Sequence, residues 1–304
     1  MKHVVTILLL FMVFVSCEKP ITSDSGSDDS QGVKADDNLV VSVPVDGLSF
    51  TRLNFAVYDM TGTRVKQVNQ QMDLSRTASF QLAPLRRSTA DFGKASIQLA
   101  PLRRSTALFG TASFQLAPGN YALVVVAHSS DGNPTMTDPK KIQFKNAQGF
   151  TDTFVYYDHV TIGDERVNLL VTPKRIVALC RFVLTDDYPA GVAKMRFYYT
   201  GGSGAFDATT GLGCVNSKQS LSFDVTSGQK QFDLYTFLHD TEGTIHLTVT
   251  ALDVSDVELL QRDFDVPLTQ NKITWMTGSF FSNSMTISTV SNNADWDGEY
   301  HLTF

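Results

Sequence analysis

Cysteine and tryptophan are scarce in this chain of 304 residues, which has three cysteines and two tryptophans. Cys180 and Cys214 lie in its second half, and two cysteines are too few for the disulfide framework of a small secreted domain. Cys180 falls within an apolar run, which is typical of a buried free thiol. The two could pair in an oxidising compartment, but we expect that the fold does not require a bond between them.

The chain also lacks a strong excess of positive charge and lacks long apolar runs. The formal net charge is −6, which argues against a general nucleic-acid binder. The longest apolar run, at residues 4–15, is interrupted only by Thr6 and is shorter than the roughly 20 residues that a membrane-spanning helix needs. No long segment repeats its apolar residues with the 3.6-residue period of an amphipathic helix.

Catalytic and metal-binding spacings are missing as well. The GGSG stretch at 201–204 does not make a nucleophile elbow, because Ala205 stands where glycine is required. The histidines show no HxxxH or HExxH spacing. Residues 295–298, DWDG, are only half of a calcium loop. The sequence therefore predicts no catalytic residue, no metal site and no cofactor, and indicates a binding or structural protein rather than an enzyme.

The first seventeen residues, MKHVVTILLLFMVFVSC, have the layout of a bacterial secretory signal peptide. Their end, Phe14-Val15-Ser16-Cys17, resembles the lipobox of bacterial lipoproteins, with Phe14 where leucine is more usual. The resemblance implies a signal peptide at 1–16 and an acylated Cys17 that carries fatty acids such as palmitate. Residues 17–37 should then form a polar, disordered tether. The alternative is an ordinary signal peptide with a chance cysteine.

Strand-forming residues dominate the rest of the chain, which is rich in Val, Thr, Ser and Phe. Apolar segments recur roughly every ten residues with turn signals between them, the pattern of an all-β sandwich. Pro173 ends one such segment, so we expect an N-terminal β-sandwich domain at 38–172 and a C-terminal one at 173–304. The predicted strands are 39–45, 52–59, 64–68, 112–117, 121–128, 153–157, 167–172, 176–184, 194–199, 220–225, 231–238, 244–253, 259–266, 272–281, 284–289 and 300–304.

Two hairpins are predicted in the first half. The segments 52–59 and 64–68 flank a turn with Gly62. The segments 112–117 and 121–128 flank Pro118-Gly119-Asn120, whose proline and glycine supply the dihedral angles of a tight turn.

A tandem repeat fills residues 77–110. Its two 17-residue copies, TASFQLAPLRRSTADFG and KASIQLAPLRRSTALFG, differ at three positions, and residues 111–118 begin a third copy. Only the third copy runs into Gly-Asn-Tyr and an apolar strand, so we interpret the first two as an insertion in a loop. Their arginines could form a basic patch or a protease site, but a solvated loop copied twice is the simpler interpretation. Deleting Thr77–Gly110 should leave the melting temperature unchanged or raise it. The arginines are Arg86, Arg87, Arg103 and Arg104.

Several strand-and-turn segments are distinctive: RIVA at 175–178, RFVLT at 181–185 and FYYTGGSG at 197–204. Together with 116–128 and 140–154, they resemble the FimB-like family of fimbrial subunits and anchors from Bacteroidales. The resemblance implies two tandem transthyretin-like Greek-key β-sandwich domains and attachment to the outer membrane through Cys17. It also implies a role as a fimbrial anchor or minor subunit that joins shaft subunits by β-strand exchange. The doubled insertion departs from that family.

Three classes of function compete. A fimbrial anchor would exchange a strand near 296–304 or near 39–45, and the sequence does not choose between them. A surface glycan-binding lipoprotein would share the lipid, the tether and the sandwiches, and aromatic side chains would stack on its sugars. A surface hydrolase is disfavoured by the missing catalytic grouping. The candidate sugar-binding aromatics are Tyr198, Tyr199, Trp275 and Trp296.

Overall fold

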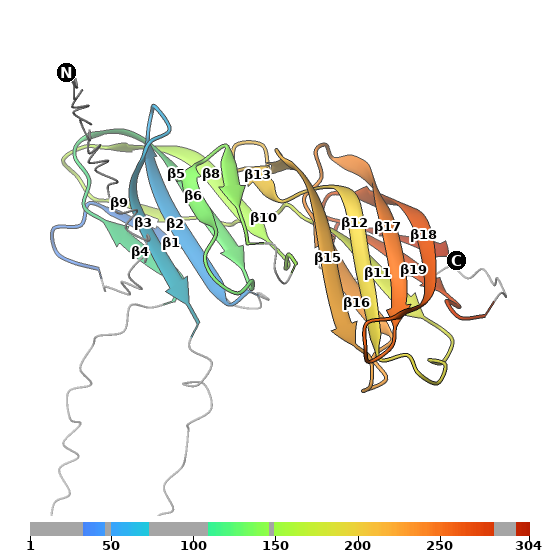
Figure 1. Ribbon diagram of the computed structural model, residues 1–304. Coiled ribbons are helices and arrows are strands. Elements are labelled where there is room, and N and C mark those ends of the chain that lie inside the picture. Colours follow the sequence, from blue (N-terminus) through green and yellow to red (C-terminus); the bar gives the residue numbers. More distant parts are fainter. Residues whose placement is uncertain (1–32, 46–49, 73–108, 146–148, 283–295) are drawn as a thin grey trace, which may run out of the picture.

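The computed structural model describes residues 33–45, 50–72, 109–145, 149–282 and 296–304. The predicted signal peptide, Cys17, most of the tether, the first two repeat copies and the strand predicted at 284–289 lie outside these residues. The described residues form strands and no helix, which confirms the all-β fold class, and none of them forms a helix that could cross a membrane. The strands make two bodies that lie side by side (Figure 1).

The first body is a sandwich of a three-stranded and a five-stranded sheet. Leu39, Phe55 and Leu123 are among the buried side chains that fill the space between the two sheets. The first sheet has the order β4 (Thr111–Phe114), β1 (Leu39–Ser42), β9 (Val167–Leu170). The second has the order β10 (Lys174–Arg175), β8 (Phe154–Ile162), β5 (Gly119–His128), β2 (Arg52–Asp59), β3 (Arg64–Gln71).

The predicted hairpin at 52–59 and 64–68 is confirmed as β2 and β3, which pair antiparallel. The predicted hairpin at 112–117 and 121–128 is wrong, because β4 pairs with β1 whereas β5 pairs with β2 and β8. The chain leaves β4 where the Asn38 side chain binds both backbone groups of Leu116, at 2.8 and 2.9 Å. The Pro-Gly segment therefore carries the chain from one sheet to the other.

The second body is a sandwich of two four-stranded sheets. Its core is rich in phenylalanine: the Phe182 and Phe197 ring centroids lie 5.4 Å apart, and those of Phe197 and Phe232 lie 4.9 Å apart. One sheet has the order β15 (Asn216–Asp224), β12 (Lys194–Ser203), β17 (Glu242–Leu252), β18 (Glu258–Thr269). The other has the order β16 (Gln231–Thr236), β11 (Ala178–Leu184), β19 (Ile273–Gly278), β20 (Glu299–Thr303).

A small sheet joins the two sandwiches. Its order is β14 (Leu212–Gly213), β13 (Ala205–Asp207), β7 (Lys141–Gln143), β6 (Thr135–Asp138), so a strand of the second body pairs with a strand of the first. A third apolar cluster lies beneath it, where the ring of Phe237 is 6.0 Å from Phe144 and 5.0 Å from Phe150. This cluster contacts the face of β5 that points away from the first core. Both faces of β5 are therefore apolar.

Two predicted boundaries shift in the structure. The polar tether was expected to stay disordered to residue 37, but the Arg166 guanidinium donates to the carbonyls of Lys34 and Asp37 at 2.9 and 2.8 Å and fixes its end. Lys174 and Arg175 pair with β8 of the first sandwich, so we place the crossing into the second sandwich after Arg175 rather than at residue 173.

Candidate assembly site: the C-terminal strand and the domain junction

The two segments predicted for strand exchange occupy different places in their sheets. β20 pairs in parallel with β19, from Ile273–Glu299 to Thr277–Thr303, and is the end strand of its sheet. Among the described strands, its other edge therefore has no partner. β1 lies between β4 and β9 and is paired on both sides. Replacing β20 would break one backbone ladder, whereas replacing β1 would break two.

Alternate side chains of β20 hold it against the second sandwich. The ring of Phe304, directly after the strand, stacks on Phe182 with centroids 4.5 Å apart and contacts Phe264 at 4.9 Å. The Lys272 ammonium donates to the Tyr300 hydroxyl at 3.2 Å, and this hydrogen bond lowers the pKa of Tyr300. A short strand with few ladder bonds thus depends on its side chains to stay in place.

A groove of about 490 Å³ opens beside β20. Its walls come from the start of β17, the end of β18 and β20, and β18 and β20 are the end strands of the two facing sheets. The lining combines apolar Leu268 and Leu302 with polar groups such as Glu242. The groove therefore lies where the end strands of the two facing sheets of the second sandwich come together.

A row of side chains crosses the outer face of the sheet that contains β20. The His301 ring lies nearly parallel to the Trp275 ring, at 9° and 5.8 Å. The Arg181 guanidinium lies 4.9 Å from the Trp275 ring centre and makes two 2.7 Å hydrogen bonds to Asp233. These bonds raise the pKa of Arg181. The row connects all four strands, including β20, through side chains.

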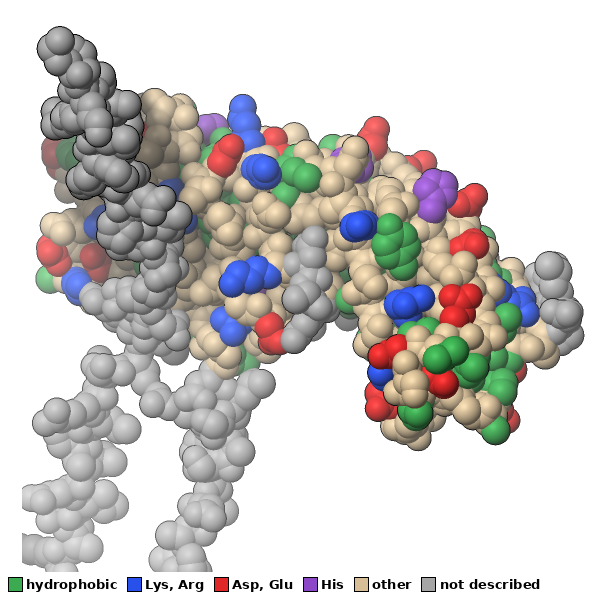
Figure 2. Space-filling model, viewed as in Figure 1, with side chains coloured by type: hydrophobic (Ala, Val, Ile, Leu, Met, Phe, Trp, Pro, Cys, Tyr) green, Lys and Arg blue, Asp and Glu red, His purple; other side chains and the backbone are tan. Residues whose placement is uncertain are grey.

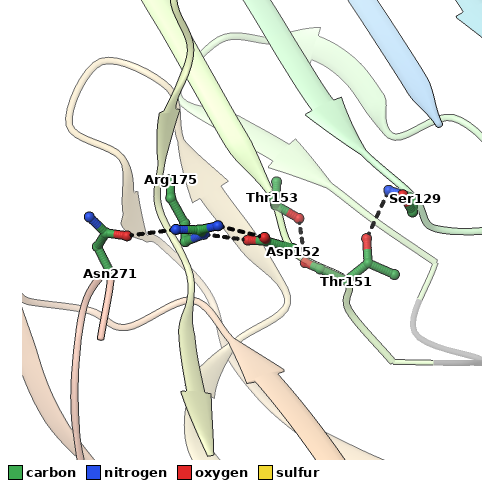
Figure 3. A network of polar contacts seen from close by, with 6 residues as sticks. All are labelled: Ser129, Thr151, Asp152, Thr153, Arg175 and Asn271. Atoms are coloured by element: carbon green, nitrogen blue, oxygen red, sulfur yellow. Dashed lines mark hydrogen bonds and ion pairs between the residues drawn. The ribbon is translucent and has the colours of Figure 1, made fainter. Parts of the chain in front are cut away.

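Arg175 lies at the junction between the sandwiches (Figure 3). Its guanidinium donates to both oxygens of the Asp152 carboxylate at 2.7 and 2.9 Å and to Asn271 Oδ1 at 3.3 Å. Asp152 precedes β8 in the first sandwich, whereas Asn271 precedes β19 in the second. The guanidinium also lies 4.7 Å from the Phe154 ring centre and 4.0 Å from that of Trp296, just before β20. Arg175 therefore contacts both sandwiches and the C-terminal segment.

The aromatic residues proposed for sugar binding do not form a common platform. Tyr198 is 37% exposed on the outer face of β12, whereas Tyr199 points into the core and is 1% exposed. Trp275 lies between Arg181 and His301, and Trp296 covers Arg175. The structure thus separates the four residues that a glycan site would need together.

The other residues singled out in the sequence have structural roles. Cys180 is buried and unbonded, and burial raises the pKa of its thiol to about 12, while Cys214 is exposed and also free. The first two glycines of the GGSG segment lie within β12, where the pairing with β15 shifts register between Tyr199 and Gly202. A Cβ atom on Gly202 would lie 2.0 Å from Thr236 Oγ1, so the close approach of β16 requires glycine.

On the face shown in Figure 2, acidic and basic side chains are interspersed rather than gathered by sign. Within the described ranges, no three His, Cys, Asp or Glu side chains lie close enough together to hold a metal ion. Cys17, the one predicted modification site, lies outside these ranges. No sequence pattern indicated that Arg175 lies at the junction, because its partners Asp152, Asn271 and Trp296 are distant in the chain.

Residues 91–303 match the model of a family described as "Family of unknown function (DUF6562)". The chain belongs to this family. No curated protein matches the sequence.

Several solved structures are similar to parts of the chain. A protein described as an adhesin from Bacteroides ovatus is 14% identical, with a TM-score of 0.48 over 75% of this chain and 82% of that one. A fimbrial assembly protein from Parabacteroides distasonis is 16% identical, with a TM-score of 0.37 over 79% and 89%. The fimbrial anchor protein Mfa2 from Porphyromonas gingivalis is 12% identical, with a TM-score of 0.37 over 74% and 81%.

Proposed function

We propose that this protein is an outer-membrane lipoprotein that serves as the anchor or a minor subunit of a fimbria at the cell surface. Cys17 carries the lipid, and the folded body joins a neighbouring fimbrial subunit by β-strand addition or exchange. The observation that carries the proposal is the position of β20, a short end strand with one edge unpaired among the described strands and a groove beside it. The resemblance of the strand-and-turn segments to fimbrial anchors supports the same proposal.

Strand addition suits a joint between subunits that must resist pulling, because it forms a whole ladder of backbone hydrogen bonds at once. An extended segment alongside β20 would satisfy backbone groups that have no partner strand in the described structure. Its alternate side chains would lie in the groove next to Leu268 and Leu302. Either β20 accepts a segment from the neighbouring subunit, or β20 itself is donated and its place is refilled.

The lipid is the other half of the proposal. Each buried CH₂ of an acyl chain contributes about 0.8 kcal/mol, so several chains on Cys17 would give lasting attachment. The polar residues after Cys17 would separate the lipid surface from the sandwich, which begins near Asn38. Together, these features describe a subunit fixed at one end and able to bind a partner at the other.

Replacing the lipidated residue tests the anchor. Cys17→Ala should prevent acylation, and the protein, with any attached fimbriae, should appear in the culture medium. The matched control is Cys214→Ala, which removes an exposed thiol of the folded body and should leave both on the cell. Fimbriae of normal length that stay cell-bound in the Cys17→Ala strain would refute the anchor. Loss of polysaccharide capture alone would favour the glycan-binding alternative.

Filling the groove tests strand addition. Gly243 lines the groove, and a Cβ atom there would contact only Leu238 Cδ2, at 3.5 Å, so Gly243→Gln can fold normally. The added side chain should reduce co-purification of the neighbouring subunit while the melting temperature is kept. Gly163→Gln makes the same change in open space on the first sandwich and should have no effect. Unchanged co-purification with Gly243→Gln would show that the groove is not used.

A further inference from the structure

We infer that the position of β4 in the first sheet also accepts residues 93–99, so that the chain holds two interchangeable strands for one place beside β1. The inference rests on what this position demands of its occupant and on which repeat copy meets those demands. It concerns the N-terminal sandwich and is independent of the proposed function.

The residue directly before β4 must be a glycine. Gly110 has a φ of +98°, and a Cβ atom on it would lie 2.8 Å from Val45 Cγ1 and 3.0 Å from the Val43 carbonyl oxygen. Its N–H donates to Gln70 Oε1 at 3.0 Å, and its carbonyl accepts from the Val43 N–H at 2.7 Å. Any other residue would meet both backbone strain and a steric clash.

Beyond this glycine, the strand in this place must carry small or apolar side chains at alternate residues, which are buried in the core. The surrounding residues otherwise bind its backbone groups. Ala112, Phe114 and Leu116 are 2%, 3% and 7% exposed in the first core. Gln70 Nε2 donates to the Thr111 carbonyl at 2.7 Å, and Asn38 binds the backbone of Leu116. The Ser113 hydroxyl, which faces outward, donates to Asp37 Oδ2 at 2.5 Å.

The second repeat copy meets these demands. Residues 92–99 read FGKASIQL and residues 109–116 read FGTASFQL, so the glycine, the buried alanine and leucine and the outward serine are all present. Ile97 would replace Phe114 with another apolar side chain. Lys94 would replace Thr111, whose hydroxyl forms a hydrogen bond with that of Ser42 at 3.3 Å.

The first repeat copy lacks the glycine that must precede the strand. Residues 77–82 read TASFQL, the same as residues 111–116, but they are preceded by Arg76 where the position needs glycine. The two spare copies therefore differ in the one feature that the structure identifies as obligatory. This difference provides an internal control.

Exchanging the third copy for the second moves 17 residues from the loop before the strand to the loop after it. Loop-closure entropy changes only slowly with length, so this transfer has a small free-energy cost. A minor state that lies a few kcal/mol above the major one is populated in about 0.1 to 10% of molecules.

Disulfide trapping tests the exchange. Val40 lies opposite Ser113, and since Val43 and Gly110 are a hydrogen-bonded pair, Val40 and Ser113 are a non-bonded pair, where side chains are closest. We would combine Val40→Cys with Ser113→Cys, Ser96→Cys, Ser79→Cys or Ser88→Cys in the full chain carrying Cys17→Ala and Cys214→Ala. Ser96 and Ser79 are the counterparts of Ser113 in the second and first copies, and Ser88 has no counterpart in β4.

Peptide mapping of the unreduced monomer should find the 40–113 bond in most molecules. The 40–96 bond should form about tenfold more often than the 40–79 bond, because a non-glycine residue in the left-handed conformation costs about 1–2 kcal/mol. The 40–88 bond gives the background, because Ser88 has no counterpart in β4. Adding Gly110→Ala should shift the linkage from 113 to 96 without unfolding the protein, and adding Gly93→Ala should abolish the 40–96 bond. The inference is overturned if position 96 crosslinks no more than position 88, or if Gly110→Ala unfolds the protein instead of shifting the linkage.

Discussion

Arg175 shows how one side chain can connect distant parts of the chain. Its side chain is 10% exposed and that of Asp152 is 13% exposed, so this ion pair is largely removed from water. Breaking a buried pair by removing one partner leaves a charge without compensation, which costs several kcal/mol. The stacked Trp296 ring adds a cation–π contact and ties the C-terminal segment to the pair.

We therefore expect Arg175→Ala to lower the free energy of unfolding by about 3 kcal/mol, measured by urea denaturation. Trp296→Ala should cost about 1 kcal/mol, and the double variant should cost less than the sum because both changes remove the same contact. Lys230→Ala is the control, because its partner Asp187 is exposed and that pair should contribute nothing measurable. Additive costs would show that Arg175 and Trp296 act independently.

His128 is a buried polar residue in the first sandwich. Its Nδ1 accepts from the Ser130 N–H at 3.1 Å, so Nε2 carries the proton and donates to Asn54 Oδ1 at 2.8 Å. Burial, and secondarily the positive charge of Arg52, lowers the pKa of His128 from 6.5 to about 3. The folded protein thus holds this imidazole neutral at pH values where the unfolded chain protonates it.

Between pH 6.5 and 3 the unfolded chain binds one proton more at this site, so stability should fall as the pH falls. The slope should be at most about 1.4 kcal/mol per pH unit, and above pH 6.5 this site should contribute no slope. Urea denaturation at several pH values should show a shallower slope for His128→Gln than for the unmodified protein. His159→Gln, at an exposed position on β8, controls for the loss of an imidazole. Equal slopes in His128→Gln and the unmodified protein would contradict the assignment.

At the scale of elements, β4 determines how the repeat can be removed. Deleting Thr77–Gly110, as the sequence suggested, would place Arg76 where the structure has Gly110, against Val45 and Val43. Deleting residues 75–108 instead removes the same length and keeps Phe109 and Gly110 before Thr111. The Gln70 side chain already binds Gly110, so the end of β3 lies close to the start of β4.

We expect the 75–108 deletion to leave the melting temperature unchanged or to raise it, because a shorter loop loses less entropy on folding. The 77–110 deletion should melt at a lower temperature, and Arg76→Gly in that background should restore it. Circular dichroism melts of these three variants and the unmodified protein would show this order. A large loss of stability in the 75–108 deletion would mean that the first two copies belong to the fold.

At the scale of the whole molecule, the junction predicts cooperative unfolding. β13 pairs with β7 across the two sandwiches, and Phe237 of the second sandwich is fully buried against Phe144 and Phe150 of the first. Domains that share a large apolar interface should not open independently. Scanning calorimetry should therefore show a single transition for the unmodified protein.

Phe237→Ala should split this transition into two, because it removes the central ring of the shared cluster. Phe232→Ala is the matched control, since it removes a ring of equal size from the core of the second sandwich alone. It should lower the transition temperature without splitting the transition. Two transitions in the unmodified protein would show that the junction does not couple the sandwiches.

Local patterns in the sequence determined the strand content, the all-β class, the β2–β3 hairpin and the free Cys180. Each follows from residues close together in the chain: alternation, a glycine turn, or a thiol within an apolar run. The same patterns predicted the wrong partner for β4, because a proline and glycine turn looks alike whether the chain stays in a sheet or crosses to another.

Only the tertiary structure decided which elements meet. The apolar residues on both faces of β5 reflect a third core shared with the second sandwich, and Arg175 depends on partners as far away as Asn271 and Trp296. The edge position of β20 and the glycine requirement before β4 likewise arise from contacts between distant segments. A sequence fixes local preference, but non-local pairing depends on packing that satisfies all segments at once, and no single segment encodes it.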